Sequence, residues 1–351
     1  MQMNCKRWSI LLLAAVMLTL TIFAGIMLLL DPVLNYGPEK SITPYYHNST
    51  LYTNPGIARH YKYDTVLVGT SMIQNTDVDL CEEVFGCTMV RLPYAGGTTF
   101  DMKTILELCF DSGNQIQTVF WELDQFQITG SATAHRYPVP EYLYNDSLSD
   151  DLSYLLNLDV MYHYGLNNIL GSLRGQVSKA ERRSVTLYGT YGTEAVLAGY
   201  SRPEKAEQVS VFENSPVHRA VDANLQNITA LVSSHPETDF VFFMPPFSVL
   251  YWDREVQNGT FEASLDATAY ALRHLLEYSN VSVYYYQGET DIISNLDNYK
   301  DYSHYCPRVN DLLTTYLAEE RNRVTPENLD SMIAALKEYI DGFNFESLLA
   351  A

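Results

Sequence analysis

The sequence is poor in basic residues and lacks the motifs of several enzyme classes. It has 22 Lys and Arg against 42 Asp and Glu, a formal net charge of -20. Nucleic-acid binding needs a basic surface that displaces counterions from phosphate, so this balance argues against a nucleic-acid partner. The chain also has no G-x-x-x-x-G-K-[ST] loop, no G-x-G-x-x-G after a strand and no H-E-x-x-H. Nucleotide binding and zinc-protease chemistry therefore have no sequence support.

Cysteine is scarce as well, with five in 351 residues and no C-x-x-C pair. A zinc ribbon or a thioredoxin-type site is therefore not indicated, and no metal site is expected. Cys81 and Cys87 are near enough in sequence for a small loop disulfide. The pairing among Cys81, Cys87, Cys109 and Cys306 cannot be deduced from spacing alone.

What is abundant is aromatic and apolar: 27 Tyr, 13% aromatic residues and 47% hydrophobic residues indicate a folded chain with a real core. One apolar run stands apart. From Ser9 to Leu30 there are 22 residues without a charge, preceded by Lys6 and Arg7 and ended by Asp31. About 20 apolar residues span a bilayer, whereas the apolar part of a cleaved signal is about 7–15 residues long.

We therefore expect residues 9–30 to be an uncleaved signal anchor that contacts the lipid bilayer, with cleavage near Ala24-Gly25 as the alternative. The positive-inside rule places residues 1–8 in the cytoplasm and the remainder outside. We therefore expect a single-pass protein of the cell membrane with an extracytoplasmic C-terminal domain.

Beyond the anchor, residues 31–62 are rich in Pro, Tyr and Asn without sustained periodicity, and we predict a stalk. Short apolar runs then alternate with helical patterns, which predicts an α/β domain with a parallel sheet over residues 63–325. Residues 130–214 interrupt the alternation and are predicted to form an insertion or lid over the sheet. Residues 326–351 are predicted to form a C-terminal helix. The expected strands are Thr65–Val68, Thr88–Leu92, Thr118–Leu123, Phe240–Met244 and Val281–Tyr286.

In such a sheet, functional sites form beyond the carboxyl ends of the strands. Ser71 follows the first expected strand, at a turn into a helix whose amide groups can hold an oxyanion. Gly96 and Gly97 follow the second strand, and Asp124 follows the third. Taken alone, Ser71 is equally explained as a helix cap, and the two glycines as a turn.

Asp301 and His304 are the more informative pair. A carboxylate and an imidazole three residues apart share one face of a helical turn. A catalytic base needs a hydrogen-bonded partner that sets its tautomer, and a nucleophile within about 3 Å. The D-x-x-H spacing alone is weak, because chance pairs are common in a chain with 42 acidic residues.

Together these blocks resemble the SGNH (GDSL-like) hydrolases, in particular their membrane-anchored, exported bacterial members. The segment 64–71, DTVLVGTS, is similar to the block that carries the nucleophilic serine, and the segment 301–304, DYSH, to the last block. The resemblance covers about residues 63–320. It implies a flavodoxin-like three-layer sandwich, Ser71 as nucleophile, His304 as base and Asp301 as its partner. It also implies that Gly97 donates to the oxyanion and that no cofactor is needed.

The sequence departs from this family at one position. The third block supplies an Asn that donates to the oxyanion, and here Asp124 occupies its place. An ionised carboxylate has no proton to donate. Either Asp124 is protonated, or it orients a neighbouring group or a substrate hydroxyl, or another donor such as Asn75 replaces it.

The function expected from the sequence is that of a serine O-acyl hydrolase or acyltransferase acting on a cell-surface polysaccharide or a similar ester. One alternative is a non-catalytic envelope protein that binds a glycan. Another is a protein that transfers acyl groups only beside a membrane acyltransferase.

Overall fold

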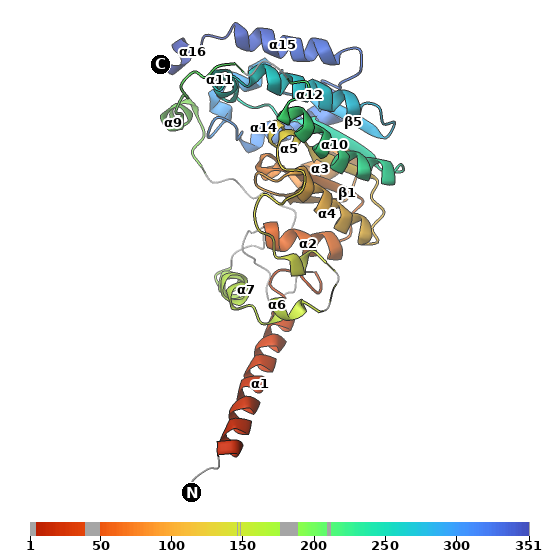
Figure 1. Cartoon of the computed structure of the whole chain (residues 1–351), viewed down its shortest axis with the longest axis vertical. Helices are drawn as coiled ribbons and strands as arrows, with labels where there is room; N and C mark the ends of the chain where they lie inside the picture. Colours follow the sequence, from red (N-terminus) through yellow and green to blue (C-terminus); the bar gives the residue numbers. More distant parts are fainter. Residues whose placement is uncertain are drawn as a thin grey trace. The chain divides into compact units, whose positions relative to one another are not determined.

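The computed structural model describes residues 5–38, 50–145, 147, 149–175, 189–208 and 212–350. The chain divides into two compact units, shown in Figure 1. One comprises Met1–Tyr61 with Val139–Glu181, and the other Lys62–Pro138 with Arg182–Ala351. We call the first the anchor unit and the second the sheet unit.

The sheet unit contains a five-stranded sheet in the order β2-β1-β3-β4-β5 in which every pairing is parallel. Its strands are continuous apolar runs, as expected when helices cover both faces of a parallel sheet. This confirms the predicted α/β fold and its parallel sheet. The strands are β1 (Thr65–Gly69), β2 (Met89–Pro93), β3 (Thr118–Glu122), β4 (Asp239–Met244) and β5 (Val281–Tyr285).

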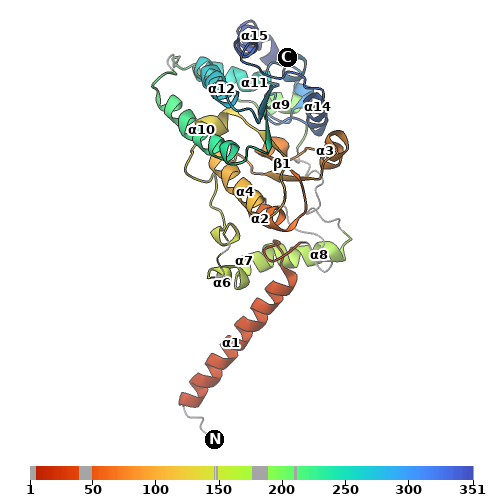
Figure 2. The same cartoon turned by 90° about the vertical axis from the view of Figure 1, so that its right-hand side faces the viewer.

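Helices α4, α10 and α12 lie on one side of this sheet and α3 and α14 on the other (Figure 2). Each of these helices presents a buried apolar stripe, the pattern by which amphipathic helices pack onto a sheet. The helices of the unit are η1 (Ser71–Ile73), α3 (Val78–Phe85), α4 (Thr99–Asp111), α5 (Gln125–Thr129), α9 (Thr193–Gly199), α10 (Pro216–Ser234), α11 (Val249–Gln257), α12 (Phe261–Leu275), α13 (Thr290–Ile293), η4 (Leu296–Asn298), α14 (Pro307–Ala318), α15 (Leu329–Asp341) and α16 (Phe345–Leu349).

The anchor unit begins with α1 (Cys5–Leu30), which includes the predicted span 9–30. Among the described residues, α1 is the one helix long and apolar enough to cross a membrane. The end of α1 packs with helices from the middle of the chain around a core that contains Met27, Val33 and Tyr154. The remaining elements are α2 (Thr50–His60), η2 (Glu141–Leu143), α6 (Asp151–Leu155), α7 (Leu158–Val160), η3 (Met161–Leu166) and α8 (Asn167–Leu173).

Two predicted boundaries differ from this division. The stalk 31–62 includes helix α2, and its residues 39–49 lie outside the described part of the chain. The insertion 130–214 does not form one body, because Val139–Glu181 clusters with the N-terminal residues and not with the sheet. A buried hydrogen bond from the Tyr154 hydroxyl to Asp31 Oδ1, 2.8 Å long, shows how closely these distant segments pack.

All five cysteines are free thiols, and the loop disulfide considered for Cys81 and Cys87 is not formed. Cys81 and Cys109 are buried in the sheet unit, and burial raises the pKa of both thiols, to about 11 and about 12. These cysteines therefore act as small apolar side chains in the core.

Candidate active site

A cavity of about 730 Å³ lies in the sheet unit, lined by residues that follow β1, β2 and β3 and by the loop that precedes α14. Ser71, Gly96, Asp124 and His304 all line it. The carboxyl ends of parallel strands meet at one edge of a sheet, which is why residues so distant in sequence converge here.

Ser71, His304 and Asp301 form a connected chain of hydrogen bonds. Ser71 Oγ lies 2.7 Å from His304 Nε2, and His304 Nδ1 lies 2.8 Å from Asp301 Oδ2. Asp301 Oδ1 also accepts the backbone N–H of His304 at 2.8 Å, which fixes the pair's spacing. With the ring proton on Nδ1, where Asp301 accepts it, Nε2 accepts the proton of the Ser71 hydroxyl.

The electrostatics of Asp301 suit that arrangement. Burial raises the pKa of this carboxyl, but the hydrogen bonds and charge of His304 outweigh the burial, as do the backbone N–H groups of His304 and Ser303. The pKa of Asp301 therefore lies well below its usual range. Asp301 remains an anion at neutral pH, which is the state that stabilises an imidazolium.

Glu122, at the end of β3, accepts hydrogen bonds from the turn that carries Ser71. Glu122 Oε2 accepts the Thr70 backbone N–H at 2.7 Å and the Thr70 hydroxyl at 2.9 Å. A Cβ at Gly69 would lie 2.8 Å from the same oxygen, so only glycine fits there. Glu122 was not among the residues expected at the site, although a charged residue inside the apolar run of β3 is a signal that could have identified it.

Two backbone amides are available for an oxyanion. Among the described residues, neither the Ser71 N–H nor the Gly96 N–H has a hydrogen-bond acceptor. The N–H of Gly97, the donor that the sequence suggested, instead donates to Tyr94 O at 2.8 Å and closes the turn. Gly96, with φ +61°, is the glycine that lines the cavity.

Asp124 lines the cavity but is only 2% exposed, and it caps α5 by accepting the Gln127 N–H at 2.8 Å. Burial raises its pKa to about 6, against the opposing effect of the Gln127 and Phe126 N–H groups, the Thr70 hydroxyl and the charge of His304. Burial and the charge of Asp124 also raise the pKa of Glu122 well above its ordinary value. Burial therefore makes both carboxyl groups keep their protons to a higher pH than an exposed carboxyl would.

Asn75, the alternative donor, does not line the cavity. Its side chain is buried and donates to the Tyr191 hydroxyl at 3.3 Å. The neighbouring carboxamide, Gln74, does line the cavity.

His135, which also lines the cavity, belongs to a second histidine–carboxylate pair that the sequence did not reveal. His135 Nδ1 lies 2.7 Å from Oδ1 of the buried Asp101, and Arg136 donates its backbone N–H to Asp101 Oδ2. Arg136 is exposed, and its guanidinium lies beside the position that a Cβ on Gly96 would take. Asp101 and His135 are separated by 34 residues, so no local pattern connects them.

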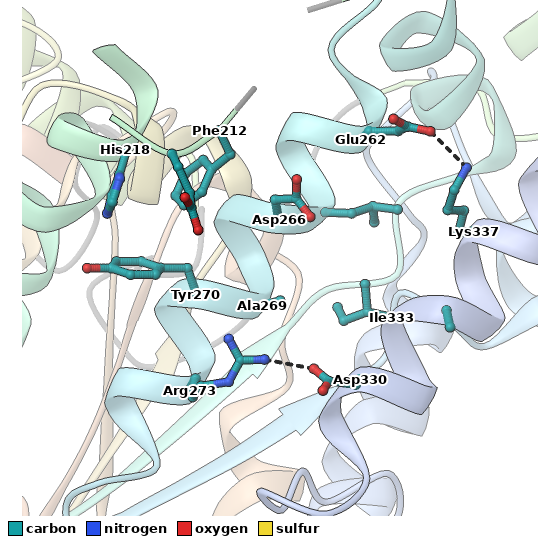
Figure 3. Close-up of a pocket in the computed structure, with 13 residues that line it drawn as sticks. Phe212, His218, Glu262, Asp266, Ala269, Tyr270, Arg273, Asp330, Ile333 and Lys337 are labelled. Atoms are coloured by element: carbon teal, nitrogen blue, oxygen red, sulfur yellow. Dashed lines mark hydrogen bonds and ion pairs between the residues drawn. The ribbon is translucent and has the colours of Figure 1, made fainter. Parts of the chain in front are cut away.

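A second hollow, of about 760 Å³, lies between α12 and α15 (Figure 3). Two ion pairs cross it, Lys337 with Glu262 at 3.1 Å and Arg273 with Asp330 at 2.7 Å. The residues that line it include no Ser, Thr or Cys. Within the described ranges, no group of three or more His, Cys, Asp or Glu is arranged to hold a metal ion.

Comparison with known proteins adds little to this geometry. No family model and no curated protein matches the chain. Among solved structures, the chain is similar to one described as "a putative platelet activating factor from Streptococcus pneumonia". The two share 10% sequence identity with a TM-score of 0.38, over 83% of this chain and 91% of that chain.

Proposed function

We propose that this protein is a membrane-anchored serine O-acyl hydrolase or acyltransferase of the SGNH type that acts on an ester of a cell-surface polysaccharide. The observation that carries the proposal is the 2.7 Å contact between Ser71 Oγ and His304 Nε2, with Asp301 on the other ring nitrogen. A hydroxyl, an imidazole and a carboxylate in this order are the parts needed for acyl transfer through serine.

In the first half of the reaction, His304 Nε2 takes the Ser71 proton as Ser71 Oγ attacks the acyl carbonyl carbon. The anionic oxygen of the tetrahedral intermediate accepts hydrogen bonds from the Ser71 and Gly96 N–H groups. Asp301 stabilises the imidazolium, which then protonates the leaving alcohol as the C–O bond breaks. In the second half, water or a sugar hydroxyl attacks the acyl-enzyme, with His304 again as base.

The order of the parts along the chain supports the SGNH assignment. The sheet order 2-1-3-4-5 is that of flavodoxin-like folds, and the serine follows the first strand. The histidine lies in the loop before α14, Pro307–Ala318. The charge-free stretch of α1, residues 9–30, supports attachment to the cell membrane, and Lys6 and Arg7 before it favour residues 1–8 in the cytoplasm and the sheet unit outside.

Asp124 favours a second candidate, a non-catalytic protein that uses the same cavity to bind a glycan. Above pH 6 this carboxyl is ionised, and a negative charge near the oxyanion opposes the reaction. The third candidate, transfer only beside a membrane acyltransferase, predicts an isolated protein with very slow hydrolysis.

The test is hydrolysis of a short-chain acyl ester by the full-length protein in detergent, together with covalent labelling by a fluorophosphonate. We expect turnover and a label on Ser71, both lost in Ser71→Ala. Ser131→Ala is the matched control, because Ser131 lines the same cavity and its hydroxyl only accepts the Thr133 N–H. Equal turnover in Ser71→Ala and the wild type would contradict the proposal, and absence of both turnover and label would favour the glycan-binding candidate.

A further inference from the structure

A stripe of exposed apolar side chains runs along the anchor unit. Residues 158–173 form a continuous helical segment made of α7, η3 and α8. Five large apolar residues on it are between 44% and 78% exposed. They are Leu158, Tyr162, Leu166, Leu170 and Leu173. Their spacing of four, four, four and three residues places them on one face of the helix.

The opposite face of this segment is buried against the end of α1. Val160 and Tyr164 belong to the same core as Met27 and Val33. A Cβ at Gly165 would lie 3.8 Å from Leu30 Cδ1, so the two helices approach closely. The segment is therefore fixed by one face, and its apolar stripe is turned outward by that packing.

The segment that carries the stripe lies beside the end of α1. Figure 2 shows α7 and α8 running across the C-terminal end of α1. The exposed apolar surface of α1 extends to Leu29, which is 71% exposed. At 26 residues, α1 is about 39 Å long and so exceeds the hydrocarbon core of a bilayer, about 30 Å. Its charge-free part, residues 9–30, is about 33 Å long, so in an anchored protein Asp31 and the segment packed against the end of α1 lie near the edge of the hydrocarbon core.

We propose that the helical segment 158–173 lies in the membrane interface, with its leucine stripe among the lipid acyl chains beside the exit of α1. The inference rests on the membrane anchoring included in the proposed function. An apolar stripe of this size exposed to water is unfavourable, whereas an amphipathic helix in the plane of the interface buries it. Tyr162 suits that depth, because tyrosine concentrates at membrane interfaces.

The consequence is a second contact with the bilayer in addition to the span. One helix through the membrane leaves the anchor unit able to tilt and rotate about it. A helix lying across the exit holds the unit in one orientation, because tilting would lift leucine side chains out of the lipid.

The experiment is photo-crosslinking of the full-length protein in phosphatidylglycerol and phosphatidylethanolamine vesicles. A benzophenone amino acid replaces Leu166 or Leu170, and adducts are identified by mass spectrometry. Val84, a partly exposed apolar residue of α3 in the sheet unit, is the matched negative control, and Leu18 within α1 is the positive control. We expect lipid adducts at positions 166 and 170 at least fivefold above those at position 84.

The control positions distinguish a failure of the membrane anchor from a failure of the interfacial helix alone. No lipid adduct at position 18 would overturn the membrane anchor itself, and with it this inference. Lipid adducts at position 18 but only background at positions 166 and 170 would overturn the interfacial helix alone. Adducts to a protein at those positions would assign the stripe to a partner and would also overturn it. An unchanged melting temperature in each labelled protein shows that the substitutions preserve the fold.

Discussion

Two histidines, His304 and His135, line the same cavity, and the carboxylates that contact them have different surroundings. Asp301 holds His304 from three residues away, and Ser71 lies against the far nitrogen of the ring. Asp101 holds His135 at a similar distance, 2.7 Å, but its side chain is almost fully buried and completes a capping box with Thr98 at the start of α4. The same two side-chain types therefore lie beside a serine hydroxyl in one pair and form part of a helix cap in the other.

The comparison teaches that a histidine–carboxylate contact is not evidence of catalysis by itself. Asp101 accepts hydrogen bonds from the Thr98 N–H, the Thr98 hydroxyl and the Arg136 N–H as well as from His135. The carboxylate oxygens of Asp101 are therefore occupied by hydrogen bonds that stabilise the local fold. What distinguishes His304 is that the Ser71 hydroxyl lies 2.7 Å from Nε2, the ring nitrogen that does not contact Asp301.

The largest expected effect separates the two histidines. His304→Ala removes the base and should lower kcat/KM for ester hydrolysis by about 10³-fold or more. His135→Ala removes a side chain that lines the cavity and should lower kcat/KM by less than about tenfold. The measurement is steady-state kinetics of both variants beside the wild type, and similar losses in the two would remove the distinction drawn between the pairs.

A smaller effect separates the two carboxylates. Asp301→Ala should lower kcat/KM by about 10²–10⁴-fold, because His304 loses the partner that sets its tautomer. Asp101→Ala leaves buried donors unpaired and should cost about 1–3 kcal/mol of stability, with activity changed less than about tenfold. Thermal unfolding and kinetics on the same samples test both. A large loss of activity without loss of stability in Asp101→Ala would assign the second pair a catalytic role.

The sequence indicated Ser71 and the Asp301–His304 pair because each segment carries a local signal, whereas the contact between Ser71 and His304 joins residues 233 apart in the chain and was expected only from the resemblance. Strand β1 is an apolar run that ends at Gly69, Ser71 follows it directly, and Asp301 and His304 share one turn. The five strands were predicted for the same reason, since buried parallel strands are continuous apolar segments.

The rest depends on contacts between distant segments. Nothing in the sequence joins Asp101 to His135, and the choice between Gly96 and Gly97 depends on which amide closes the turn onto Tyr94. The stripe of residues 158–173 has helical spacing, but spacing does not tell whether an apolar face meets a core or lipid. Its packing against the end of α1 shows which face is buried, and so leaves the leucine stripe exposed.

The smallest expected effect on activity is that of replacing Asp124, which lines the cavity. Its pKa is raised from 3.8 to about 6, so the folded protein binds this proton more tightly than the unfolded chain. The stabilisation is therefore complete below about pH 4 and is lost as the pH rises through about 6.

Asp124→Asn keeps a capping side chain for the Gln127 N–H and removes the buried charge. The variant should therefore not lose stability between pH 4 and 6 as the wild type does. It also adds an amide donor to the cavity, where the family places one, and we expect kcat/KM at pH 7.5 to rise about threefold or more. Unfolding measured across pH 4–8, with kinetics at pH 7.5, tests both expectations. A lower kcat/KM than wild type would show that this protein uses the carboxylate itself, to orient a substrate hydroxyl or a neighbouring group, since an amide of the same shape cannot replace its acceptor oxygens.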